Sequence, residues 1–393
     1  MILNHQFHRS ASWRAKLVLL ALSLAVLPLA ATAMSQDGTA PPVGPPAGVD
    51  DAPQAPSHDR ELVKLDGSVR SVVWSGDGKL FASVSTRRVP ATEDGPRRFD
   101  WFETVRIHDA QSGKELHSLG ELKKRYADWI FSPDGSLLAL SWRDDDGDHV
   151  ELWDTATARL RHKVALDYAR VNPTLAFAPD SKTLAVAYGG LRTELMMNGA
   201  RLIEVRTGRE LQTLAQPGSM GPAPAFSPDG QLMATGDYSS GSVRLWSVAT
   251  GQQISQLAGV NGTALVVAFS PDGKTLACGS TGSGIQLWDV STYKSKSSPV
   301  ENPPTCTQLV FSPDSRLLAA ASPALEPQSR RDAATTWKKT EVRIWNVASG
   351  KLLVTIPDAS DSLAFSPDGE SLHVLAPGGG IQCVTIPKGT TEK

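Results

Sequence analysis

The 393-residue sequence lacks the short motifs of the common catalytic chemistries. It has no Gly-x-Ser-x-Gly nucleophile elbow, no glycine-rich phosphate loop and no His-Glu-x-x-His zinc motif. Its eight histidines are scattered, and they are better explained as packed side chains than as ligands. We therefore expect no catalytic residues, no cofactor and no enzymatic activity.

Cysteine and excess charge are also scarce. Cys278, Cys306 and Cys383 have no metal-binding spacing, and any disulfide would leave one thiol over, with the pairing undetermined by sequence. The 39 basic and 41 acidic residues give a net charge of −2. A chain with this balance is not expected to bind nucleic acid through bulk charge.

One phrase recurs seven times: an apolar run that ends in Phe-Ser-Pro-Asp-Gly and is followed by Leu-Ala or a similar pair. Four copies are clean and three are worn, and they begin at Trp74, Phe131, Phe177, Phe226, Phe269, Phe311 and Phe365. The intervals of 57, 46, 49, 43, 42 and 54 residues fit a propeller repeat with inserts. Proline fixes φ, aspartate bonds its own backbone and glycine accepts positive φ, so each phrase predicts a tight turn.

Every turn joins two apolar runs, the expected strands a and b. Alternating third strands c follow, and many of them end in Trp: 150–154, 243–247, 285–289 and 342–346. Thr-Gly or Ser-Gly turns then lead to outermost strands d. The pattern predicts an all-β, seven-bladed β-propeller of four-stranded antiparallel blades over residues 61–393. The seventh copy has no d strand of its own, and 61–65 would supply it, closing the ring and covering two sheet edges.

The Trp-Asp ends of the c strands, the glycine turns after them and the Ser-Pro-Asp-Gly turns resemble the WD-repeat family of β-propellers, in its degenerate bacterial form. His108, Ile203 and Val384 stand where the family has Trp, and no Gly-His pair precedes an a strand. The family's buried Asp–His–Ser/Thr–Trp network is therefore not expected to form in the usual way. The resemblance implies a protein-interaction scaffold. Six-bladed periplasmic propellers share a similar turn, but seven copies and the Trp-Asp ends argue against that type.

The N-terminus has a separate organisation. Arg9, Arg14 and Lys16 precede an uncharged apolar run that ends in Ala31-Thr32-Ala33, which predicts a secretory signal peptide over residues 1–33. An uncleaved signal anchor is the alternative, because the run is near membrane-spanning length. The proline-rich residues 34–60 predict a disordered linker. We expect export to the periplasm or the extracellular space, with a membrane association only if the signal is retained.

The acidic run around Gly147 is the best candidate for a metal site, through Asp144, Asp146 and Asp148. The run is short and lacks a distant bidentate glutamate, which favours a solvated turn between strands b and c. The a strands, which line the channel, offer only Arg70, Asp128 and Asp361, on different blades. An enzyme or metal-dependent binding module at the channel mouth of a periplasmic propeller remains the alternative function.

Two expected b–c loops are long, 86–103 in blade 1 and 323–340 in blade 6, and both flank blade 7. They combine cations with tryptophan, the side chains that dominate interfaces: Arg87, Arg88, Arg97, Arg98, Trp101, Arg330, Arg331, Trp337, Lys338 and Lys339. This pattern predicts a binding site for an anionic protein, peptide or polymer. The alternative is that both loops are solvated insertions. The sequence does not predict the oligomeric state.

Overall fold

The computed structural model describes residues 58–65, 69–90, 99–122, 125–143, 147–166, 173–188, 198–216, 224–237, 241–296, 303, 305–323, 340–360, 362–376 and 378–387. The elements in these ranges are all β-strands, as predicted. Over the same ranges, no helix has the length and apolar character needed to span a membrane. The predicted signal segment 1–33 lies outside them.

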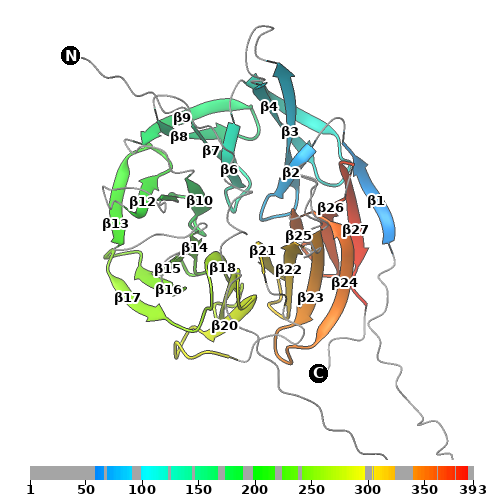
Figure 1. Cartoon of the computed structure of the whole chain (residues 1–393). Helices are drawn as coiled ribbons and strands as arrows, with labels where there is room; N and C mark the ends of the chain where they lie inside the picture. The colour runs from blue at the N-terminus through cyan, green and yellow to red at the C-terminus, as the bar shows by residue number, and fades with distance from the viewer. Residues whose placement is uncertain are drawn as a thin grey trace, which may run out of the picture. The chain divides into compact units, whose positions relative to one another are not determined.

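The strands form seven antiparallel sheets arranged in a ring (Figure 1). Blade 1 consists of β2 Val69–Trp74, β3 Leu80–Pro90, β4 Phe99–Asp109 and β5 Glu115–Leu122. Blade 2 consists of β6 Arg125–Phe131, β7 Leu137–Arg143, β8 Asp148–Asp154 and β9 Arg159–Leu166. Blade 3 consists of β10 Thr174–Phe177, β11 Thr183–Tyr188, β12 Asn198–Glu204 and β13 Glu210–Gln216. Blade 4 consists of β14 Ala225–Phe226, β15 Leu232–Gly236, β16 Val243–Ser247 and β17 Gln253–Leu257. Blade 5 consists of β18 Ala264–Phe269, β19 Thr275–Ser280 and β20 Ile285–Asp289. Blade 6 consists of β21 Gln308–Phe311, β22 Leu317–Pro323, β23 Thr340–Asn346 and β24 Leu352–Ala359, and blade 7 of β25 Leu363–Phe365, β26 Ser371–Leu375, β27 Gly380–Thr385 and β1 His58–Lys64.

The prediction of four-stranded antiparallel blades is confirmed in six of the seven sheets over their full set of strands. In blade 5 the described residues form three strands, and a single antiparallel bridge between Trp288 and Ser295 marks the place of the fourth.

The predicted closure of the ring is confirmed. β1 pairs antiparallel with β27, and the innermost strand β2 lies beside both β6 and β25, so blade 7 stands between blades 6 and 1. β1 begins at His58. The strand therefore includes the last three residues of the segment 34–60 that was assigned to the linker.

The repeated phrase forms the same hydrogen-bonded turn in six blades, although Gly76 replaces the proline in blade 1 and Ser315 replaces the glycine in blade 6. In each, the serine hydroxyl donates to the aspartate two residues on at 2.5–2.7 Å. The same hydroxyl accepts the N–H of the first b-strand residue at 2.9–3.0 Å. In blade 3, Ala178 replaces the serine, but Asp180 still accepts the N–H of Lys182. Four contiguous residues therefore specify each turn, as the sequence predicted.

These turns give the fold a predictable response to acid. The donated hydrogen bonds hold the pKa of Asp229 and Asp368 below its ordinary value, chiefly through Ser227 and Ser366. For Asp134, partial burial alone would raise the pKa, but the bonds from Ser132 and Ser136 outweigh it. A folded-state pKa below the unfolded value stabilises the protein above the unfolded pKa of about 3.9, and this stabilisation is lost as the pH falls through the folded value.

We therefore expect the free energy of unfolding to fall as the pH drops below about 4. The triple variant Asp134→Asn, Asp229→Asn and Asp368→Asn should be less stable than the wild type at pH 7 and should lose less between pH 7 and pH 3. Urea midpoints at the two pH values measure both quantities. Equal losses in the two proteins would contradict this role for the turn carboxylates.

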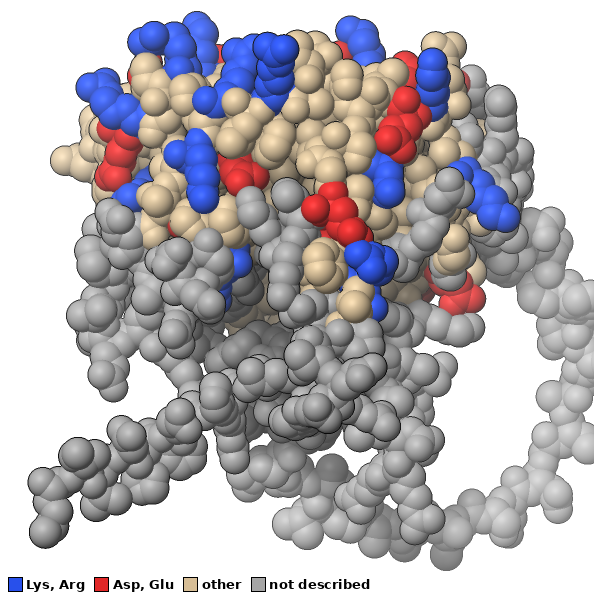
Figure 2. Space-filling view, turned by 90° about the horizontal axis from the view of Figure 1, so that it is seen from above, with Lys and Arg blue, Asp and Glu red and all other residues tan. Residues whose placement is uncertain are grey.

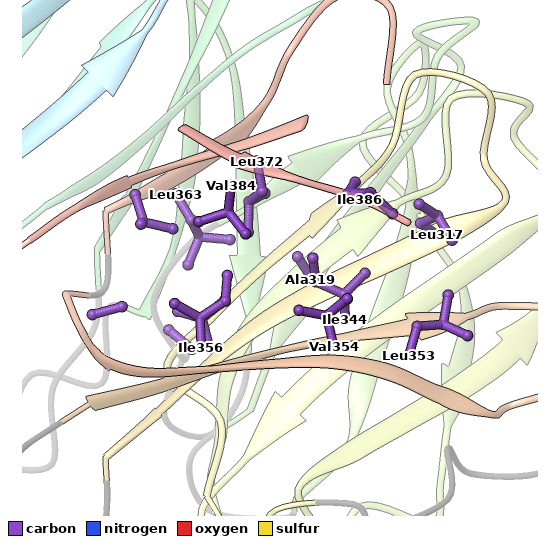
Figure 3. Packing of buried hydrophobic residues seen from close by; sticks show 14 residues of the cluster. Leu317, Ala319, Ile344, Leu353, Val354, Ile356, Leu363, Leu372, Val384 and Ile386 are labelled. Atoms are coloured by element: carbon purple, nitrogen blue, oxygen red, sulfur yellow. The ribbon is translucent and has the colours of Figure 1, made fainter. Parts of the chain in front are cut away.

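The hydrophobic core is divided among the interfaces between blades. Figure 3 shows the cluster between blades 6 and 7, where Ile344 and Val354 pack against Leu372 and Val384. Cys278 and Cys306 are free and buried in clusters on opposite sides of blade 5, and burial raises the pKa of Cys278 to about 12. The disulfide left open by the sequence is not formed, since Cys383 is also free.

Candidate binding hairpin of blade 1

The segment 86–103 of blade 1 was predicted to be a loop, but its described part is a β-hairpin. Strands β3 and β4 remain in register from Thr86–Glu103 out to Pro90–Phe99, beyond the last pairs with β2 and β5. The correction has a simple cause: both arms are rich in Val, Thr, Phe and Trp, which favour strands. Arg97 and Arg98 lie outside the described residues.

Arginine and aromatic side chains face one another across this hairpin. Arg87 is opposite Phe102, with its guanidinium carbon 4.9 Å from the ring centroid, and Arg88 is opposite Trp101 at 5.6 Å. Adjacent pairs point to opposite faces of a ribbon, so each face carries one such contact. The Trp101 side chain is 41% exposed. The sequence correctly singled out these residues but did not show that they form cross-strand cation–π pairs.

Glu121 of β5 changes the charge of the hairpin. Its two carboxylate oxygens accept hydrogen bonds from Nε and a terminal nitrogen of Arg87, both at 2.7 Å. This contact lowers the pKa of Glu121. Arg87 is therefore neutralised locally and contributes less to an anion site than the sequence indicated. Arg88 and Trp101 form the second cation–π pair of the hairpin, and the Trp101 ring is partly exposed.

The base of the hairpin is tied to blade 2 by a buried carboxylate. Glu103 is 1% exposed, and its Oε2 accepts hydrogen bonds from Arg70 at 3.0 Å and from the N–H of Tyr126 at 2.8 Å. Arg70 also donates to the Tyr126 carbonyl and lies 4.4 Å from the Trp129 ring centroid. Sequence reasoning missed Glu103, because nothing local shows that its partners come from two other strands.

A second carboxylate that joins two blades is Asp128, one of the a-strand residues considered for catalysis. Asp128 of blade 2 accepts the N–H of Leu175 in blade 3 at 2.8 Å. Asp361 lies outside the described residues. Arg70 and Asp128 thus connect neighbouring blades.

The acidic candidates for metal binding are not brought together in the described structure. Asp148 is 1% exposed and forms an ion pair with Arg143, 2.7 Å from its Nε. Asp144 and Asp146 lie outside the described residues. Across the ranges that the structure covers, no group of three or more His, Cys, Asp or Glu side chains is arranged to hold a metal ion.

The blade 6 candidates Arg330, Arg331, Trp337, Lys338 and Lys339 also lie outside the described residues. The roots of their segment are described: Pro323 at the end of β22 pairs with Thr340 at the start of β23. Since blade 7 separates blades 6 and 1, this root and the blade 1 hairpin stand on either side of it, as the sequence predicted.

The opposite edge of the propeller is charged but balanced. The a–b and c–d turns end at this edge, and some of their exposed cations pair with acids of the same turn: Lys79 with Asp77 at 3.1 Å, and Arg206 with Glu204 at 3.8 Å. Figure 2 shows Lys and Arg side chains in large number along one edge, with Asp and Glu among them. This rim is therefore not a one-sign surface for an anion.

The comparison with known families agrees with the geometry. The family described as WD domain, G-beta repeat matches residues 223–247 and 251–289, which span most of blade 4 and blade 5 up to the end of β20. No curated protein has a significantly similar sequence. The matched repeats occur twice within a closed ring of seven blades that share one turn and one strand register. The family match over two blades and the ring of seven blades together support a WD-repeat β-propeller.

Proposed function

We propose that this protein is an exported, non-catalytic scaffold that captures an anionic partner through the b–c segments of blades 1 and 6. WD-repeat propellers typically act as protein-interaction scaffolds and bind proteins or peptides. The observation that carries the proposal is the blade 1 hairpin, which extends past its neighbouring strands and holds Arg88 and the exposed Trp101. Functional residues often lie on extensions that a rigid scaffold positions.

The charge of the two segments favours an anion. In the sequence, Arg97 and Arg98 directly precede β4, and Arg330, Arg331, Lys338 and Lys339 fall between β22 and β23. Glu121 pairs with Arg87. Cations gathered around one gap raise the rate of encounter with an anionic partner and make capture sensitive to salt, while a desolvated Trp supplies much of the affinity.

Export is the second part of the proposal. It rests on the basic, apolar and small-residue order of 1–33 and on the proline-rich 34–60 that precedes β1. The protein isolated from the envelope or medium of its native cells should begin at Met34. An intact Met1 chain in the soluble cytoplasm would contradict export, whereas an intact chain in membranes would support the anchor.

Partner capture by that mature protein tests the binding site. Replacing Arg88, Arg97, Arg330 and Arg331 with Glu, together with Trp101→Ala, should reduce capture from native envelope extracts by at least tenfold, about 1.4 kcal/mol. Capture by the wild type should weaken as salt rises from 50 to 500 mM. Captured proteins are quantified by mass spectrometry, and circular dichroism confirms that the variant folds.

A matched control uses the opposite edge. Lys114, Arg159, Arg209 and Lys351 are exposed at c–d turns, and their replacement with Glu makes the same change in charge away from the hairpin. This variant should capture partners as well as the wild type does. Equal capture by all three proteins would overturn the proposed site. Equal loss in both variants would show that capture depends on net charge alone and not on this site.

A further inference from the structure

The interface between blades 7 and 1 differs from its counterparts in one side chain. Where a c strand ends in Trp, the indole packs against the preceding blade, as Trp246 of blade 4 does against Leu202 and Leu214 of blade 3. Trp288 and Trp345 lie likewise in the clusters shared with blades 4 and 5. In blade 1 the equivalent residue is His108, whose register partner Phe81 matches Met233, the partner of Trp246.

His108 occupies only part of the space that an indole fills. Its ring stacks on Phe81 with centroids 4.5 Å apart and planes 4° apart, and its Nε2 is hydrogen bonded to Ser83 Oγ at 2.9 Å. Thr235 holds Trp246 through the equivalent hydroxyl at 2.9 Å. The family's Trp–hydroxyl bond is thus kept in blade 4 and replaced by a histidine contact in blade 1.

A pocket of about 320 Å³ lies beside His108 at this seam. The β1 side contributes Val63, Lys64 and Leu65, and the blade 1 side contributes Ser83, Arg106 and Glu115. The volume is at the lower end of the range for small-molecule sites, which combine apolar walls with a few polar groups. The pocket lies between the closing strand β1 and blade 1.

Arg106 can be compared directly with the arginine at the same position of blade 4. Arg244 takes the same place in blade 4, two residues before Trp246; it bonds Asp237 at 2.8 Å and its side chain is 10% exposed. Arg106 bonds Ser85 at 2.8 Å and pairs with Glu115 at 3.4 Å, and its side chain is 32% exposed. The guanidinium is thus more accessible where the indole is missing.

The charges that line the pocket do not cancel. Among the described lining residues, Lys64 and Arg106 are cations and Glu115 is a carboxylate that pairs with Arg106; burial lowers the pKa of His108, so its ring is neutral at pH 7. Two cations and one carboxylate give this described lining one net positive charge. Val63, Leu65 and Val69 offer that ligand an apolar wall.

We propose that this seam pocket binds a small aromatic carboxylate. The flat ring takes the space that an indole fills at the Trp-containing interfaces and lies against Val63 and Leu65. The carboxylate accepts hydrogen bonds from Arg106 and meets the charge of Lys64, a pairing stronger than a neutral one. This site is independent of partner capture by the hairpin, and either can fail without the other.

Titration of the mature full-length protein with indole-3-acetate and benzoate tests the proposal, with neutral indole as the comparison ligand. Isothermal titration should show saturable one-to-one binding of the carboxylates. Arg106→Gln should weaken indole-3-acetate at least tenfold and leave neutral indole within twofold. Gln is compatible with the position because blade 5 carries Gln286 there. Arg343→Gln, the same change in blade 6, is the matched control and should have no effect.

His108→Trp provides a second, independent variant. It should fill the pocket, abolish binding of all three ligands and raise the melting temperature. No saturable binding to the wild type at 10 mM ligand would overturn the proposal. So would equal affinity in the wild type and Arg106→Gln, or undiminished binding by a folded His108→Trp protein.

Discussion

Removal of residues 1–66 is expected to lower the melting temperature by about 10 °C, whereas removal of 1–57 should leave it nearly unchanged. The longer deletion removes β1, exposes the edge of β27 and strips Val63 and Leu65 from the cluster that contains Phe81 and Ile381. Burying two such side chains stabilises a protein by about 1.5–3 kcal/mol each. About 5 kcal/mol in total corresponds to roughly 10 °C for a domain of this size.

Differential scanning calorimetry of the two truncated proteins measures the effect. The shorter deletion is the control, because it ends one residue before β1 and removes all of the segment that precedes the closing strand. An exposed β27 edge should also make the longer deletion more prone to associate, which light scattering detects. Equal melting of the two proteins would mean that β1 does not hold the ring closed.

Replacement of Glu103 with Ala is expected to destabilise the propeller by about 3–5 kcal/mol, the cost of breaking a buried ion pair. Its carboxylate accepts from Arg70 and from the Tyr126 N–H, so the substitution deprives a partly buried cation and a buried backbone donor of their shared acceptor at once. Both groups belong to the junction between blades 1 and 2, and loss of the contact should therefore loosen the base of the hairpin as well.

Glu121→Ala is the matched control. Glu121 is also a glutamate of blade 1 that binds an arginine, but the Arg87–Glu121 pair is exposed, and exposed pairs contribute little to stability. Urea unfolding should show a large shift for Glu103→Ala and almost none for Glu121→Ala. Similar shifts for the two variants would show that the buried carboxylate has no special structural role.

Much of the fold was predictable because its signals are local. The turn serine, proline, aspartate and glycine act on neighbouring atoms, and the c-strand alternation follows from one buried face. Blade number, ring order and the closing strand were therefore predicted correctly. The hairpin was missed because a two-stranded extension has no buried face and so leaves only a weak alternation to detect.

The sequence alone determined the seven repeats, the turn that each one forms and the replacement of Trp by His108. The tertiary structure decided what those residues contact. Arg87 meets Glu121, 34 residues away, and Asp148 is committed to Arg143, because strand register brings them together. The pocket beside His108 likewise depends on β1 returning from the other end of the chain. Such contacts join distant segments, and their distances are set by packing in three dimensions rather than by spacing along the chain.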